Sequence, residues 1–149
     1  GQKKINLIYG GGNVGLMGIV ADAVMEQGGE VVGVIPHFLL KREVGHRGIT
    51  RLEVVKSMHQ RKKRMADLAH AFIALPGGWG TLEELSEVLT WRQLGLVKQP
   101  VALLNVNSFF NPLLDQLRKM IQEGFVRPEY LGILKVEVTV EKVLASLDE

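Results

Sequence analysis

The sequence has 149 residues, the length of one domain, and its 46% hydrophobic content is sufficient for a core. Its formal charge of +2 favours neither a nucleic acid nor a membrane surface as partner. The absence of cysteine excludes disulfides and thiolate metal sites, and the four histidines lack metal-ligand spacing. No apolar run approaches the roughly 20 residues that span a bilayer, and the first residues lead into a predicted strand without a signal-peptide pattern. We therefore expect a cytoplasmic protein without a metal.

The first half of the chain predicts alternating strands and helices separated by glycine and proline. Gly10-Gly-Gly12 ends the first strand, Gly28-Gly29 is a helix C-cap signal, and Ser57 is a helix N-cap signal. A polar, turn-rich stretch at 37–50 predicts a loop. The elements expected here are strand 5–9, helix 14–27, strand 31–35, a short strand 52–55 and helix 57–69.

The second half continues the alternation, with Pro112 in the first turn of one helix. The expected elements are strand 71–75, helix 81–96, strand 100–104, helix 111–124, strand 133–136 and helix 140–147. Continuously apolar strands that alternate with helices indicate a parallel sheet covered on both faces. The sequence therefore predicts the α/β class, a Rossmann-like doubly wound fold, in a single domain over residues 1–149.

The first glycine loop, Gly10 to Gly15, fits the G-x-G-x-x-G pattern of dinucleotide sites and lies between a strand and a helix. Such sites use an acid at the end of the next strand for the ribose hydroxyls. That strand ends at Pro36 and His37, and Glu30 lies at its opposite edge, which disfavours NAD. Two interpretations remain about equally supported: phosphate binding, and close packing of helix on strand.

The second glycine loop, Pro76 to Thr81, joins a strand to a helix, so its backbone N–H groups point to the space before a helix N-terminus. This geometry favours an anion. It is not a Walker loop, because the Lys-Ser/Thr pair is missing. Glu84 follows in the first predicted turn. It is either a functional carboxylate or the partner of an N-cap at Thr81 in a capping box.

A basic cluster runs from Lys56 to Arg64. It predicts a solvated helix face or a nucleic-acid patch, but aromatic residues do not interleave, which counts against the patch. Arg61 lies in the first turns of a helix that starts at the carboxyl edge of the predicted sheet, where ligands bind. A cation there can hold a phosphate or a developing anion.

These motifs resemble the LOG family, the cytokinin riboside 5′-monophosphate phosphoribohydrolases, long labelled "possible lysine decarboxylase". The resemblance covers essentially the whole chain. It rests on Pro76-Gly-Gly-x-Gly-Thr-x-x-Glu84, Ser57-Met-His-x-Arg-Lys62, Tyr9-Gly-Gly-Gly-x-Val-Gly-Leu-Met-Gly18, Gly33-Val-Ile-Pro36, Leu89-Thr-Trp91 and Leu103-Leu-Asn105.

The resemblance implies cleavage of the N-glycosidic bond of an N6-modified adenosine 5′-monophosphate to free base and ribose 5-phosphate, without a metal or cofactor. Arg61 and Glu84 match the catalytic pair, and Glu43 matches a substrate-contacting acid. The other implied substrate-binding positions are Gly11, Gly12, Met58, Lys62, Gly77, Gly78, Trp79, Gly80 and Thr81. A decarboxylase would need a pyridoxal site with a Schiff-base lysine, which no lysine here indicates.

Three further expectations follow from the same motifs. Family members begin with one more strand and helix, so we expect residues upstream of Gly1 in the natural protein or an incomplete site. Helix 81–96 carries surplus apolar residues on more than one side, which predicts a homodimer or a higher homo-oligomer; they are Leu82, Leu85, Leu89, Trp91, Leu94 and Leu96. The competing function is a non-catalytic carrier of a nucleotide or of molybdenum cofactor, against which the pair Arg61 and Glu84 argues.

Overall fold

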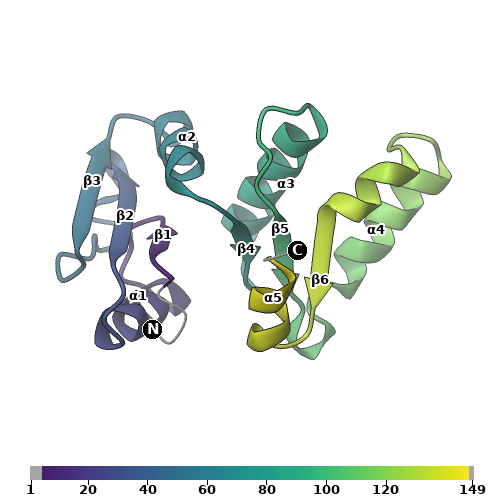
Figure 1. Cartoon of the computed structure of the whole chain (residues 1–149). Coiled ribbons are helices and arrows are strands. Elements are labelled where there is room, and N and C mark those ends of the chain that lie inside the picture. Colours follow the sequence, from purple (N-terminus) through teal and green to yellow (C-terminus); the bar gives the residue numbers. More distant parts are fainter. Residues whose placement is uncertain (1–4, 148–149) are drawn as a thin grey trace. The chain divides into compact units, whose positions relative to one another are not determined.

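The computed structural model describes residues 5–147 and separates into two compact units, the first ending at Ala69 and the second beginning at His70. Each unit contains a three-stranded parallel sheet with helices beside it (Figure 1). This confirms the α/β class and the parallel strands that the alternating sequence pattern predicts. That one domain spans residues 1–149 stays a prediction.

In the first unit the strand order is β1-β2-β3, with β2 in the middle. Tyr9 of β1 lies opposite Gly33, and Pro36 lies opposite Val55 of β3. The elements are β1 Leu7–Tyr9, α1 Leu16–Glu26, β2 Val31–Pro36, the 3-10 turn η1 His37–Leu39, β3 Arg51–Val55 and α2 Met58–Leu68.

In the second unit the strand order is β4-β5-β6, with β5 in the middle. The elements are β4 Phe72–Ala74, α3 Trp79–Gln93, β5 Val101–Leu104, the 3-10 turn η2 Val106–Ser108, α4 Asn111–Gln122, the 3-10 turn η3 Pro128–Ile133, β6 Leu134–Glu137 and α5 Val140–Ser146.

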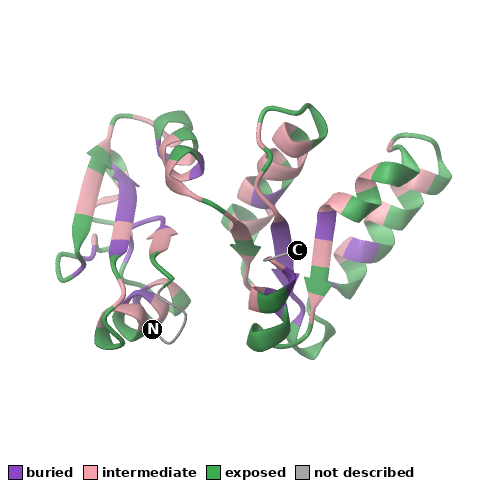
Figure 2. Ribbon diagram, in the orientation of Figure 1, coloured by how far each residue is buried: buried purple, intermediate pink, exposed green. Residues whose placement is uncertain are grey.

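The middle strand of each sheet forms the centre of its core, as the purple segments of Figure 2 show. Val31, Val34 and Ile35 of β2 have no exposed surface, and neither has Leu103 of β5. These strands are apolar on both faces because neighbours cover both, which explains why their sequences are continuous rather than alternating. Around β5 the core continues into α3 and α4 through Leu85, Phe110 and Leu114.

The carboxyl ends of parallel strands meet at one edge of a sheet, where functional loops gather. In the first unit this edge carries Gly10 after β1, the loop that begins at His37 after β2, and Ser57 after β3. In the second unit it carries the Pro76 loop after β4 and Asn105 after β5. The two glycine loops of the sequence thus each lie at such an edge.

The cap signals give the most accurate boundaries. Ser57 Oγ accepts a hydrogen bond from the backbone N–H of Gln60 at 3.2 Å, which confirms the predicted N-cap of α2. Gly28 has φ 75° and its N–H donates to the Met25 carbonyl, which confirms the C-cap of α1. No helix in the described range 5–147 is long and apolar enough to cross a membrane.

Candidate functional site

Arg61 is a buried cation in the first turn of α2, with only 5% of its surface exposed. Its Nε donates to the Val34 carbonyl at 3.1 Å, and its Nη2 donates to the Gly10 carbonyl at 2.8 Å. Nη2 also lies 3.1 Å from Oε2 of Glu43. The guanidinium is therefore tied to the ends of β1 and β2 and to the loop after β2, all at the carboxyl edge of the first sheet.

The remaining nitrogen of Arg61, Nη1, has a much weaker partner. A guanidinium offers five N–H groups, and the three bonds above use those of Nε and Nη2. Within residues 5–147, Nη1 approaches only the thioether sulfur of Met58, at 3.9 Å, and sulfur is a poor acceptor. A buried cation with two N–H groups left to a weak acceptor can bind an anion or an electron-rich ring atom.

Glu43 joins the loop after β2 to Arg61. Its side chain is about one-quarter exposed, against 6% for that of Arg61. The loop is fixed from behind, since the Asn13 N–H donates to the carbonyls of Glu43 and Val44, both at 3.0 Å. The sequence marked Glu43 only through the family resemblance, whereas the structure places it directly against Arg61.

The first glycine loop is filled by its neighbours. A Cβ at Gly10 would lie 2.0 Å from Arg61 Nη2, and a Cβ at Gly12 would lie 3.2 Å from the Glu43 carbonyl. Gly11 has φ 75°, which favours glycine, and a Cβ there would lie 2.9 Å from a methyl group of Leu52. Of the two interpretations left open by the sequence, close packing accounts for these glycines.

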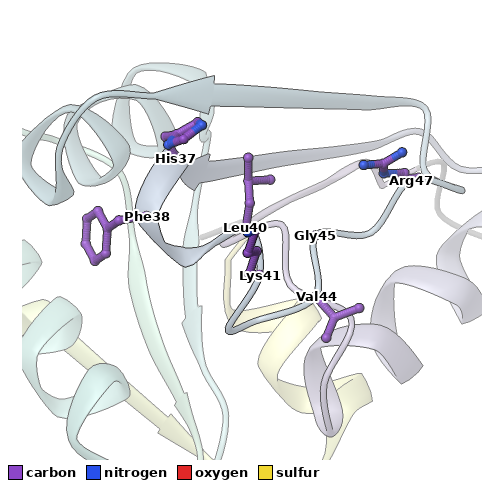
Figure 3. A pocket seen from close by; sticks show the side chains of 7 residues that line it. All are labelled: His37, Phe38, Leu40, Lys41, Val44, Gly45 and Arg47. Carbon is purple, nitrogen blue, oxygen red and sulfur yellow. The ribbon is translucent and has the colours of Figure 1, made fainter.

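A cavity of about 660 Å³ lies beside this loop, in the stretch after β2 (Figure 3). Its wall combines apolar side chains with basic ones, so it is suited to a ligand with both an apolar and an anionic part. The lining residues are His37, Phe38, Leu40, Lys41, Val44, Gly45 and Arg47. The sequence predicted only a polar loop here and missed both η1 and the antiparallel bridge between Gly12 and Gly45.

Two further cations of α2, Lys63 and Arg64, are engaged in ion pairs. Lys63 Nζ lies 2.8 Å from Asp67, and Arg64 Nε lies 2.7 Å from Glu53. The hydrogen bond from Arg64 holds the pKa of Glu53 below its usual value, and that bond raises the pKa of Arg64. With Arg61 buried as well, the Lys56–Arg64 cluster is not an open basic patch, which argues against the nucleic-acid interpretation.

The second glycine loop opens α3 earlier than predicted. The helix begins at Trp79 with Gly78 as N-cap, and no side chain caps it. Thr81 is therefore the third residue of the helix and Glu84 the sixth, so the capping box, one of the two interpretations of Glu84, is wrong. The reason is local: a Cβ at Gly77 would lie 2.2 Å from Thr81 Oγ1, so the glycine lets the threonine side chain fold back over the loop.

Gly78 and Gly80 differ from Gly10, Gly11 and Gly12 of the first loop, because a Cβ at either would meet no atom within 4 Å. Packing does not require glycine at these two positions. An uncapped helix start with open space before it is an anion-binding arrangement. The indole of Trp79 stands beside it with 87% of its surface exposed, and Glu84 is half-buried in the second turn of α3.

The two groups of candidate residues lie in different units. Arg61, Lys62, Met58, Glu43, Gly11 and Gly12 belong to the first unit, and Gly77, Gly78, Trp79, Gly80, Thr81 and Glu84 belong to the second. The structure brings Arg61, Glu43 and Met58 together in the first unit. In the described part of the chain, no group of three or more histidine or acidic side chains could hold a metal ion.

Sequence reasoning missed a polar pair behind the first glycine loop, formed by buried His46 and exposed Asp22. Nε2 of His46 lies 2.8 Å from Oδ1 of Asp22, and Nδ1 of His46 accepts the Gly48 N–H at 3.2 Å. Neighbouring Tyr9 has a buried hydroxyl with no partner in the described range. Burial, and secondarily the charge of Asp22, raises the pKa of Tyr9 to about 12. Only the polar character of stretch 37–50 hinted at such contacts.

Comparisons with known proteins show which family this chain resembles. Residues 17–147 match the family model described as "Possible lysine decarboxylase". A probable cytokinin riboside 5′-monophosphate phosphoribohydrolase of Oryza sativa subsp. japonica is 48% identical over 99% of this chain and 60% of its own length. A cytokinin riboside 5′-monophosphate phosphoribohydrolase of Arabidopsis thaliana is also 48% identical, over 99% of this chain and 68% of its length. A second rice protein of that name is 47% identical, over 99% and 61%.

The fold and the paired glycine loops thus define an α/β protein of the class that binds ligands at the carboxyl ends of parallel strands. Within that class the chain belongs to the family described as possible lysine decarboxylases, together with the LOG phosphoribohydrolases. The chain spans 60% to 68% of the length of the three relatives above.

Proposed function

We propose that the protein hydrolyses the N-glycosidic bond of an N6-modified adenosine 5′-monophosphate. The bond between C1′ of the ribose and N9 of the base breaks, water supplies a hydroxyl group to C1′, and N9 receives a proton. The products are the free base and ribose 5-phosphate. This reaction is the one named for relatives that are 47–48% identical to this chain over 99% of its length.

The observation that carries the proposal is the state of Arg61, a buried guanidinium with one nitrogen, Nη1, left to a weak sulfur contact. A fixed, desolvated cation favours charge that develops on a leaving group or rests on a phosphate. The guanidinium is held in place by hydrogen bonds to the carbonyls at two strand ends and to a carboxylate. An arginine that served only stability would be expected to satisfy Nη1 as well.

Glu84 supplies the second catalytic group in this proposal. Glycosidic cleavage passes through a state in which C1′ carries positive charge. A carboxylate close to C1′ stabilises that charge and orients the attacking water. The N-terminus of α3 and the loop Gly77 to Thr81 receive the 5′-phosphate, because uncapped N–H groups and the helix dipole favour an anion there.

The remaining residues of the proposed site hold the nucleotide. Lys62 adds positive charge next to Arg61, and Met58 offers an apolar surface to the base. Glu43 contacts the substrate through the carboxylate oxygen that does not face Arg61. Gly11 and Gly12 contribute through their backbone N–H groups, since neighbouring atoms fill their side-chain positions.

The proposal includes a homodimer and a cytoplasmic location, where nucleoside monophosphates are available. After α3 ends, Leu94 and Leu96 have 64% and 69% of their surface exposed, and a second copy would cover them. Replacing Leu94 with Asp should convert a dimer to a monomer in light scattering. A monomeric wild-type protein at micromolar concentration contradicts the dimer.

The reaction is tested by identifying the products. The full-length protein is incubated with N6-isopentenyladenosine 5′-monophosphate. The products are separated by chromatography and identified and quantified by mass spectrometry. We expect N6-isopentenyladenine and ribose 5-phosphate in equal amounts, and none with Arg61→Lys, which keeps the charge but loses the planar fork. Nucleoside plus phosphate would indicate a phosphatase, and tight binding without turnover would indicate a carrier.

A further inference from the structure

Val44 has an unusual backbone conformation. Its φ is 48°, in the left-handed region, which β-branched residues rarely adopt. It lies in the loop after β2, directly after Glu43, with 56% of its surface exposed. Strained residues persist only where the surrounding structure fixes them, and they concentrate at functional sites.

Backbone hydrogen bonds on both sides fix this turn. On one side, the Asn13 N–H donates to the carbonyls of Glu43 and Val44, and the His46 N–H donates to the Gly11 carbonyl at 2.9 Å. On the other side the loop closes on itself, since the Glu43 N–H donates to the Leu39 carbonyl at 2.8 Å. The left-handed residue is thus anchored to the first glycine loop before and after it.

The direction of the chain at Val44 decides where Glu43 points. The Glu43 carboxylate lies 3.1 Å from Nη2 of Arg61, which also donates to Gly10. With Nε bonded to Val34, the plane of the guanidinium is fixed on three sides. Nη1 is then the one nitrogen left toward Met58. Moving Glu43 would free one of the two N–H groups of Nη2 and leave the guanidinium plane held only by the bonds to Gly10 and Val34.

We propose that Val44 is a positioning residue: its left-handed backbone directs the Glu43 carboxylate onto Arg61, which keeps Nη1 available for the substrate. This inference rests on the proposed function, because it assumes that Nη1 of Arg61 binds the substrate. The role belongs to the backbone of Val44. Its isopropyl group also lines the cavity of Figure 3, and a direct contact between that group and a ligand is the competing explanation that the test must separate.

The kinetic test uses three variants at one position. Val44→Gly and Val44→Asn accept the left-handed conformation, so we expect kcat and KM within about threefold of wild type. Val44→Pro excludes it, because proline fixes φ near −65°. We expect kcat to fall by about 10²-fold with little change in KM, and the double variant with Glu43→Gln to be no slower than the slower of the two single variants.

Ser108→Gly is the matched control, since Ser108 is also a left-handed non-glycine residue, with φ 59°, in the second unit. It should leave kcat and KM unchanged. A rise in KM for Val44→Gly at constant kcat would overturn the proposal in favour of the side-chain contact. If Val44→Pro does not fold, the Val44→Gly and Val44→Asn kinetics still decide between backbone and side chain.

A second readout does not depend on activity. The Nε–H of a fixed arginine exchanges slowly and gives a sharp ¹⁵N–¹H signal. We expect a sharp Arg61 signal in the wild type and in Val44→Gly, and faster exchange with a weaker signal in Val44→Pro and Glu43→Gln. An unchanged signal in Val44→Pro would refute the positioning role. A protein that shows this pattern of signals but releases no base would refute the proposed function alone.

Discussion

Arg61 Nη2 donates a hydrogen bond to the carbonyl of Gly10 at 2.8 Å, across 51 positions of sequence. The bond joins the first turn of α2 to the end of β1 and leaves no room for a side chain at residue 10, where a Cβ would lie 2.0 Å from the same nitrogen. Gly10 looks like part of a phosphate-binding loop in the sequence, but in the structure it makes room for the buried guanidinium of Arg61 and accepts its hydrogen bond.

Gly10→Ala should damage both stability and activity. The new methyl group must displace a guanidinium whose other bonds, to Val34 and Glu43, hold it in place. We expect a loss of about 3 kcal/mol in the free energy of unfolding and nearly complete loss of turnover. Denaturant titration measures the first and base release the second. Wild-type stability in this variant would contradict the packing described for Arg61.

Gly80→Ala should have the opposite effect on stability. Gly80 lies in the first turn of α3, and a Cβ there meets no atom within 4 Å. Alanine is the better helix former, so we expect a gain of about 0.5–1 kcal/mol. If the loop receives the 5′-phosphate, the methyl group will obstruct it and KM for the monophosphate will rise. A more stable variant with unchanged KM would show that phosphate does not bind at this helix start.

Glu84→Gln separates a catalytic role from a structural one. The amide has nearly the shape of the carboxylate but no charge, and Glu84 is not the partner of an N-cap at Thr81. We expect turnover to fall by roughly 10²-fold or more while the melting temperature stays within about 2 °C of wild type. Glu83→Gln, on the same helix, is the matched control and should retain activity. Similar losses in both variants would remove Glu84 from the catalytic pair.

Tyr9→Phe should stabilise the protein. The hydroxyl is buried without a partner in the described range, and removing such a group saves its desolvation cost, about 1 kcal/mol. The pKa of Tyr9 is raised to about 12, so the folded state binds this proton more tightly than the unfolded state does. Stability from this group is complete below pH 10 and is lost as the pH rises toward 12.

Thermal unfolding from pH 8 to pH 12 checks both statements about Tyr9. The wild type should lose stability over the upper part of this range, and Tyr9→Phe should lose less. Lower stability of Tyr9→Phe at pH 8 would mean that the hydroxyl has a hydrogen-bond partner after all, such as an internal water near Asp22.

The sequence predicted those features that depend on neighbouring residues. Ser57 capped its helix as expected because the bond from Gln60 spans one turn, and the middle strands were recognisable as continuous apolar runs. The start of α3 was missed by two residues. Thr81 and Glu84 have capping-box spacing, but the glycines before them allow the helix to begin at Trp79.

Features that depend on distant contacts were beyond a single sequence. Arg61 is held in position by hydrogen bonds to carbonyls 27 and 51 positions away in the sequence. No local sequence pattern indicates such partners. The left-handed turn at Val44 was equally hidden, because valine gives no sign of that conformation and the bonds that impose it come from Asn13. The family resemblance named Glu43 and Arg61 without indicating that they touch.

The central claim is that the protein cleaves the glycosidic bond of a nucleotide and requires its 5′-phosphate. The direct measurement is kcat/KM for base release from N6-isopentenyladenosine 5′-monophosphate and from N6-isopentenyladenosine. Binding energy from the phosphate is used to reach the transition state, so we predict a preference of about 10³-fold or more for the monophosphate. Equal values for the two substrates, or no base from either, would contradict the account.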